Sequence, residues 1–74
     1  MTAPRRFPPP WRVEESTESF RIVDATGQAL AYVYFEDDDG RRKVMGRLTR
    51  DEARRIAANI AKLPDLLSRS NDAG

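Results

Sequence analysis

The spacing of apolar residues changes once along the chain, from alternation in the first half to helical spacing in the second. Alternating apolar and polar residues predict a short strand at 11–14, which ends in the polar run 15–18. The same period of two predicts a second strand at 20–23 and a third at 29–35. The first half of the chain is therefore expected to form a three-stranded sheet.

The segment Asp24-Ala-Thr-Gly27 has the composition of a tight turn. An aspartate side chain accepts hydrogen bonds from the backbone two residues further on, and glycine adopts the positive φ that such turns require. The second and third strands are therefore expected to form an antiparallel hairpin.

The second half of the chain contains one well-marked helix start. Thr49 and Glu52 have the spacing of a capping box, in which each side chain accepts a hydrogen bond from the other residue's backbone. Apolar residues then recur at helical spacing and predict one buried stripe. This stripe consists of Ala53, Ile56, Ala57, Ile60 and Leu63. Pro64 predicts an end or a kink at Leu63, with Leu66 and Leu67 in a last turn.

The segment 36–48 allows two interpretations. The run 36–40 is compatible with a hairpin turn into a fourth strand at 42–45. Alternatively, Asp38 or Asp39 caps a short helix that Gly46 ends. Because Val44 and Met45 are adjacent and do not alternate, the pattern favours the helix.

The two ends of the chain differ from its middle. Three consecutive prolines at 8–10 favour an extended arm over 1–10 that brings Trp11 to the edge of the core. Residues 68–74 are small and polar and are expected to form a flexible tail. Together these patterns predict one α+β domain at 11–67, a three-stranded antiparallel sheet packed on one C-terminal helix.

The third strand is apolar on both faces, with Leu30, Tyr32 and Tyr34 on one side of it. A single helix can cover only one face of the sheet. The other face is either covered by Trp11, the proline arm or the last turn, or it is an exposed interaction surface. The candidate protein-interface residues are Val23, Leu30, Tyr32, Tyr34, Leu66 and Leu67.

The composition excludes several kinds of binding site and catalytic site. The chain has 74 residues, of which 39% are hydrophobic, and it contains neither cysteine nor histidine. Disulfides, the usual zinc sites and histidine acid–base catalysis are therefore excluded. No nucleophile motif or glycine-rich phosphate loop is present. The sequence thus predicts a non-enzymatic protein without a cofactor, a catalytic residue or a small-molecule substrate.

The acidic run Glu36–Asp39 does not match a calcium loop. With the pattern aligned on Gly40, Phe35 would occupy the first ligand position and Gly46 the last. Adjacent carboxylates are typical of a solvated turn, so no metal site is predicted, although a loose contact with a cation stays open.

The formal net charge is only +1, from 13 basic and 12 acidic residues, but the basic residues cluster after Gly40. This cluster makes nucleic-acid binding the alternative function, since it could neutralise phosphates. Its candidate contacts are Arg41, Arg42, Lys43, Arg47, Arg50, Arg54 and Arg55. The near-neutral net charge and the neighbouring acidic residues weigh against it.

Nothing in the sequence indicates a signal peptide, because prolines follow Arg5 and Arg6 where an apolar segment would be needed. No apolar run is long enough to span a bilayer. We therefore expect a cytoplasmic protein that does not insert into membranes.

The segment Phe20-Arg-Ile-Val-Asp-Ala-Thr-Gly-Gln-Ala-Leu-Ala-Tyr-Val-Tyr-Phe35, followed by Leu48-Thr-Arg-Asp-Glu-Ala-Arg-Arg-Ile-Ala-Ala-Asn-Ile-Ala-Lys-Leu-Pro64, resembles a family of short uncharacterised bacterial proteins. The resemblance covers most of 7–67 and implies no activity, ligand or partner. The sequence itself favours a module for binding another protein or a second copy, through the second face of the sheet.

Overall fold

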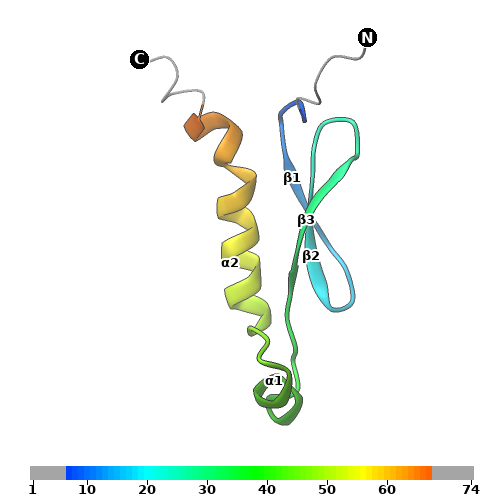
Figure 1. Ribbon diagram of the computed structural model, residues 1–74, viewed down its shortest axis with the longest axis vertical. Coiled ribbons are helices and arrows are strands. Elements are labelled where there is room, and N and C mark those ends of the chain that lie inside the picture. The colour runs from blue at the N-terminus through cyan, green and yellow to red at the C-terminus, as the bar shows by residue number, and fades with distance from the viewer. Residues whose placement is uncertain (1–6, 68–74) are drawn as a thin grey trace.

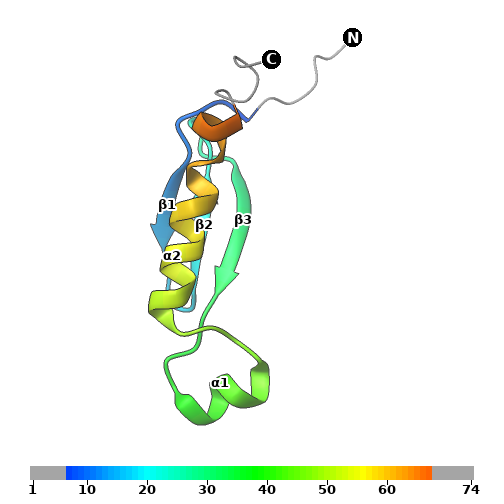
Figure 2. The same ribbon diagram turned by 90° about the vertical axis from the view of Figure 1, so that its left-hand side faces the viewer.

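The computed structural model describes residues 7–67 of the chain. The strands β1 (Arg12–Glu15), β2 (Ser19–Val23) and β3 (Ala29–Tyr34) form an antiparallel sheet in the order β1-β2-β3. Helix α2 (Arg50–Ala61) lies along one face of this sheet, and α1 (Asp39–Met45) lies beyond its end (Figures 1 and 2). The predicted α+β class and its sheet-plus-helix architecture are confirmed.

The turn between β2 and β3 is built around the Asp24 carboxylate, which is 2% exposed. One carboxylate oxygen accepts hydrogen bonds from the Thr26 backbone at 2.8 Å, the Thr26 hydroxyl at 2.6 Å and the Gln28 backbone at 3.0 Å. Gly27 has a φ of 94°, a conformation that glycine adopts without steric cost. The predicted mechanism of this turn is confirmed.

Of the two interpretations of the segment 36–48, the short helix is confirmed: residues Asp39–Met45 form α1 and not a fourth strand. The Asp38 side chain accepts a hydrogen bond from the Arg41 backbone at 2.8 Å, and Gly46 ends the helix in the left-handed conformation. These two caps satisfy backbone groups that a short helix leaves unpaired. No side chain of α1 is buried, and Val44 is 88% exposed.

Helix α2 starts with the predicted capping box. The Thr49 hydroxyl accepts from the Glu52 backbone at 3.1 Å, and the Glu52 carboxylate accepts from the Thr49 backbone at 2.8 Å. The chain bends at Lys62, and a further helical turn reaches Leu67. A break was expected at Leu63, before Pro64; it lies one residue earlier, at Lys62, and Leu63 itself belongs to the following helical turn.

The core lies between α2 and the sheet and is thin. Phe20, Ile22 and Phe35 are buried against Ala53 and Ala57, with the two phenylalanine ring centroids 5.2 Å apart.

The prediction of the buried stripe was wrong for two of its members, because Ile56 is 43% and Leu63 is 38% exposed. The closest approach runs through Ala53 and Ala57, whose small side chains let the helix lie near the sheet. Ile56 precedes Ala57 by about 100° around the helix, so it lies on the flank of α2.

The N-terminal arm lies beside the turn between β2 and β3. The Ala25 backbone donates to the Pro8 carbonyl at 2.9 Å, and the Trp11 indole donates to the Phe7 carbonyl at 2.8 Å. Trp11 packs against the edge of the core, as expected. The remainder of the predicted arm, 1–6, and the predicted tail, 68–74, lie outside the described residues.

Candidate protein-interaction surface

One face of the sheet is turned away from α2, and we call it the outer face. The cross-strand register aligns Glu14 with Arg21 and Arg21 with Tyr32, while Tyr34 is opposite Ser19. Their neighbours Val13, Ile22 and Ala31 pack against the core on the other side. Because side chains alternate between the two faces of a strand, Glu14, Arg21, Tyr32 and Tyr34 share the outer face.

Two tyrosines of the edge strand β3 are exposed on the outer face. Tyr32 is 52% and Tyr34 is 46% exposed, and their stacked rings have centroids 6.2 Å apart. The Arg47 guanidinium lies over the Tyr34 ring, 5.1 Å from its centroid, and pairs with Glu18 at 3.4 Å. Cation–π and ring–ring contacts restrict both rings to a defined orientation.

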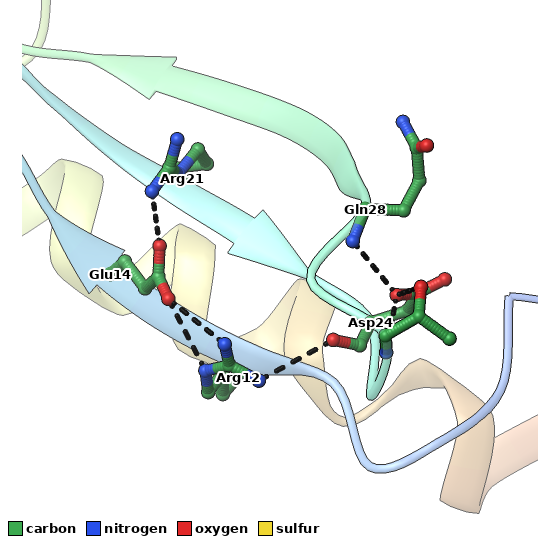
Figure 3. A network of polar contacts seen from close by, with 6 residues as sticks. Arg12, Glu14, Arg21, Asp24 and Gln28 are labelled. Carbon is green, nitrogen blue, oxygen red and sulfur yellow. Dashed lines mark hydrogen bonds and ion pairs between the residues drawn. The ribbon is translucent and has the colours of Figure 1, made fainter.

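Arg21, which is opposite Tyr32 in the sheet, belongs to a chain of charged side chains. Figure 3 shows this chain, which runs from Arg21 through Glu14 and Arg12 to the Asp24 turn. Arg21 forms an ion pair with Glu14, which also pairs with Arg12 at 3.1 Å, and Arg12 donates to the Asp24 carbonyl at 3.4 Å. The hydrogen bond from Arg21 is the main cause that lowers the pKa of Glu14 below its ordinary value. The border of the outer face therefore carries fixed charges of both signs.

The other candidate interface residues are placed differently. Val23 is 1% exposed, which contradicts its assignment to a free surface, since the side chain is enclosed beside the hairpin turn. Leu30 is half-buried. Leu66 and Leu67 are 50% and 57% exposed, but they lie at the end of the bent helix, on the helix side of the molecule (Figure 1).

The sequence interpretation left out three residues of this surface, Glu14, Arg21 and Arg47. The alternation of Arg21 with Phe20 and Ile22 already placed it on the face opposite the core, so the period of two contained that signal. Arg47 reaches Tyr34 only because the chain returns to the sheet after α1, which no local pattern indicates.

The arginine cluster of the alternative function is extensively paired with carboxylates. Arg50 pairs with Glu15 and, at 2.8 Å, with Asp37, and its guanidinium lies 4.5 Å from the Phe35 ring centroid. Each of the other five arginines of the cluster also forms an ion pair. These pairs are Arg41–Glu36, Arg42–Asp39, Arg47–Glu18, Arg54–Asp51 and Arg55–Asp51.

The acidic run is occupied by structural contacts. Asp37 pairs with Arg50, Asp38 caps α1, and Asp39 pairs with Arg42. The hydrogen bond from Arg50 is the main cause that lowers the pKa of Asp37. Within 7–67, no three carboxylates gather in a group that could hold a metal ion.

The surface of the described residues carries shallow hollows in several places. One of about 150 Å³ lies on the outer face beside Tyr32, Arg21 and Glu14. A second, of about 300 Å³, separates the proline arm from the end of α2. A third, of about 380 Å³, lies along the flank of α2 beside Leu48 and Ile56.

A scan against protein-family models, a search of curated proteins and a search of solved structures find no match to this chain. Over the described range, no helix combines the length and the apolar character needed to cross a bilayer. The surface geometry is therefore the basis for inferring a function.

Proposed function

We infer that this chain is a small protein-binding module that acts by association, with a partner protein or a second copy, and not by catalysis. The observation that carries this proposal is the pair of stacked, half-exposed tyrosines on a sheet face that no described element covers. Tyrosine is enriched at protein interfaces because its ring is buried while its hydroxyl stays hydrated.

The contacts around the tyrosine pair support the proposal further. Arg47 lies over one ring, and the hydrogen bond between Arg21 and Tyr32 contributes to raising the pKa of Arg21, after the larger effect of Glu14. Side chains that are already ordered lose less conformational entropy when a partner binds. Such a surface is suited to recognition.

The carboxylates support a role other than acid–base catalysis. Ion pairs and hydrogen bonds from Arg21, Arg50 and Arg54 lower the pKa values of Glu14, Asp37 and Asp51. A general acid or base works best with a pKa near the operating pH, and these shifts go in the opposite direction.

The ion pairs also favour protein binding over the nucleic-acid alternative. A phosphate approaching Arg50, Arg54 or Arg55 would have to compete with carboxylates that already contact these side chains. The electrostatic gain that dominates nucleic-acid affinity is thereby reduced.

A photo-crosslinking amino acid at Tyr34 tests the proposal in cells that express the chain. We expect a discrete crosslinked species from this position and none from the matched control position Val44, which is exposed on α1. Replacing the neighbouring Tyr32 with serine should weaken the crosslink from Tyr34. Equal crosslinking from Tyr34 and Val44, or no effect of Tyr32→Ser, would contradict the proposal.

A further inference from the structure

The free edge of β3 is unprotected, in contrast to the opposite edge of the sheet. Its sequence, ALAYVY, carries no charge and no proline. The other edge strand, β1, is shorter and carries Arg12, Glu14 and Glu15. Monomeric proteins usually protect edge strands with charges, prolines or very short strands. The β3 edge lacks the first two devices.

The hydrogen-bond pattern shows which backbone groups point outward from this edge. The Phe35 N–H donates to the Glu18 carbonyl at 3.0 Å, toward β2. Because successive residues of an antiparallel strand alternate in direction, Val33 and Ala31 also face β2, whereas Tyr32 and Tyr34 direct their backbone groups to the free edge.

The chain closes one end of this edge itself. Glu36 continues the alternation, and its outward N–H donates to the Leu48 carbonyl at 2.9 Å, next to the parallel bridge between Phe35 and Leu48. No described segment pairs with the edge at Tyr32. The open part of β3 is therefore short and includes Tyr32.

An exposed isoleucine of α2, Ile56, lies near the same edge. Arg50, at the start of α2, reaches both Glu15 at the end of β1 and Asp37 beyond the end of β3. Ile56 shares a groove with Leu48, the residue that bridges to the end of β3, and the polar side chains of Glu52, Arg55 and Asn59 also line this groove. Ile56 is 43% exposed, and Leu63, which follows the bend at Lys62, is 38% exposed.

We propose that two copies of this chain pair antiparallel along their β3 edges, about a two-fold axis at Tyr32, and form one six-stranded sheet. This inference deepens the proposed function and rests on its premise that the chain acts by association. A two-fold interface must use the same patch on both copies, so the strand must be complementary to itself.

The β3 sequence meets that requirement. With Tyr32 opposite its own copy, Tyr34 lies opposite Leu30, and Ala31 opposite Val33. The tyrosines and leucines fall on the outer face, where aromatic and aliphatic cross-strand neighbours stabilise a sheet. Alanine and valine fall beneath the helices, where little space is available.

The same arrangement lets the two α2 helices meet. Strands lie about 4.8 Å apart, so the two β2 strands would be about 14 Å apart. Helices with their side chains are about 10–12 Å wide, so two copies of α2 would lie side by side on the sheet.

The positions of Tyr32 along β3 and of Ile56 along α2 also agree. From Phe35 back to Tyr32 the strand covers about 10 Å, which a helix covers in about seven residues. Seven residues after Thr49 is Ile56, which would therefore lie beside the two-fold axis. Ile56 would therefore contact Ile56 of the second copy and lose its exposure to water.

Sedimentation from about 1 µM to about 1 mM tests whether the full chain forms a concentration-dependent dimer. Ile56→Lys places two like charges at the axis and should weaken the dimer about tenfold or more. The matched control Val44→Lys introduces the same charge on α1 and should leave the dimer unchanged. Trp11 fluorescence checks that both variants are folded.

Amide hydrogen exchange tests the pairing itself in the unmodified chain. The Tyr32 amide should become protected as the protein concentration rises. The control is the Val13 amide, which points out of the β1 edge, since Ser16 N–H donates to the Ser19 carbonyl and sets the alternation there. It should exchange at the same rate throughout.

A monomer at all concentrations, or a dimer in which the Tyr32 amide stays unprotected, would overturn the proposed pairing. Either result would leave the proposed function intact if Tyr34 still gives a specific crosslink. If the dimer forms and protects the Tyr32 amide but Tyr34 gives no crosslink, only the proposal that the chain binds through its outer face would be contradicted.

Discussion

Asp24 shows how one side chain can determine the geometry of a turn. Its buried carboxylate accepts hydrogen bonds from two backbone N–H groups and one hydroxyl, within the segment that reverses the chain between β2 and β3. The hydrogen bond from the Thr26 hydroxyl is the main cause that lowers the pKa of Asp24 below its ordinary value of 3.8. The ionised form is thus favoured by folding.

This shift predicts a pH-dependent stability with a definite sign. A carboxyl whose pKa is lower in the folded state contributes stability above its unfolded pKa and loses it as the pH falls through the folded pKa. We expect Asp24→Asn, which keeps an acceptor oxygen but cannot titrate, to flatten the acid limb of the unfolding curve below about pH 4.

Thermal unfolding followed by Trp11 fluorescence at several pH values measures this effect. An unaltered acid limb in Asp24→Asn would show that the turn does not couple to protonation.

At the scale of elements, α2 is positioned by its alanines. Ala53 and Ala57 are 0% exposed, while the larger Ile56 and Leu63 remain on the flank. A helix that contacts a sheet through small side chains lies close to it, and its branched residues then extend past the contact. This arrangement leaves Ile56 exposed, and the proposed dimer would cover it.

The close contact predicts a strong dependence on side-chain size at Ala57. Ala57→Leu should destabilise the fold by about 1–3 kcal/mol, because the added atoms force the helix away from the sheet. Ala58→Leu, one residue further around the helix and half-buried, is the matched control and should have a smaller effect. Chemical denaturation measures both, and equal effects would contradict the alanine contact.

At the scale of the whole molecule, charge is distributed as local pairs. The net charge is +1, and the six arginines of the basic cluster each contact a carboxylate. Such pairing reduces the long-range positive potential that draws a protein to polyanions.

We therefore predict weak heparin binding, with elution at low salt. Arg54→Glu combined with Arg55→Glu should change the elution only slightly, and Asp51→Asn should strengthen retention because it frees both arginines from their shared partner. Firm retention of the unmodified chain, lost in the charge-reversal variant, would favour the nucleic-acid alternative.

The sequence by itself determined the local elements, because their causes are local. The alternation around Arg21, the Asp24 turn and the Thr49 cap each depend on residues a few positions apart, and each of the corresponding predictions was confirmed. Even the choice between helix and strand at 39–45 depended on Asp38 and Gly46, two residues next to that segment.

Only the tertiary structure decided which surfaces stay open. Burial depends on how α2 is rotated on the sheet and where the arm lies, and these result from many distant contacts acting together. This is why Val23 is enclosed, Ile56 is half-exposed and Arg47 reaches Tyr34. The sequence established that β3 is apolar on both faces, whereas the packing of the described residues left its outer face and one edge uncovered.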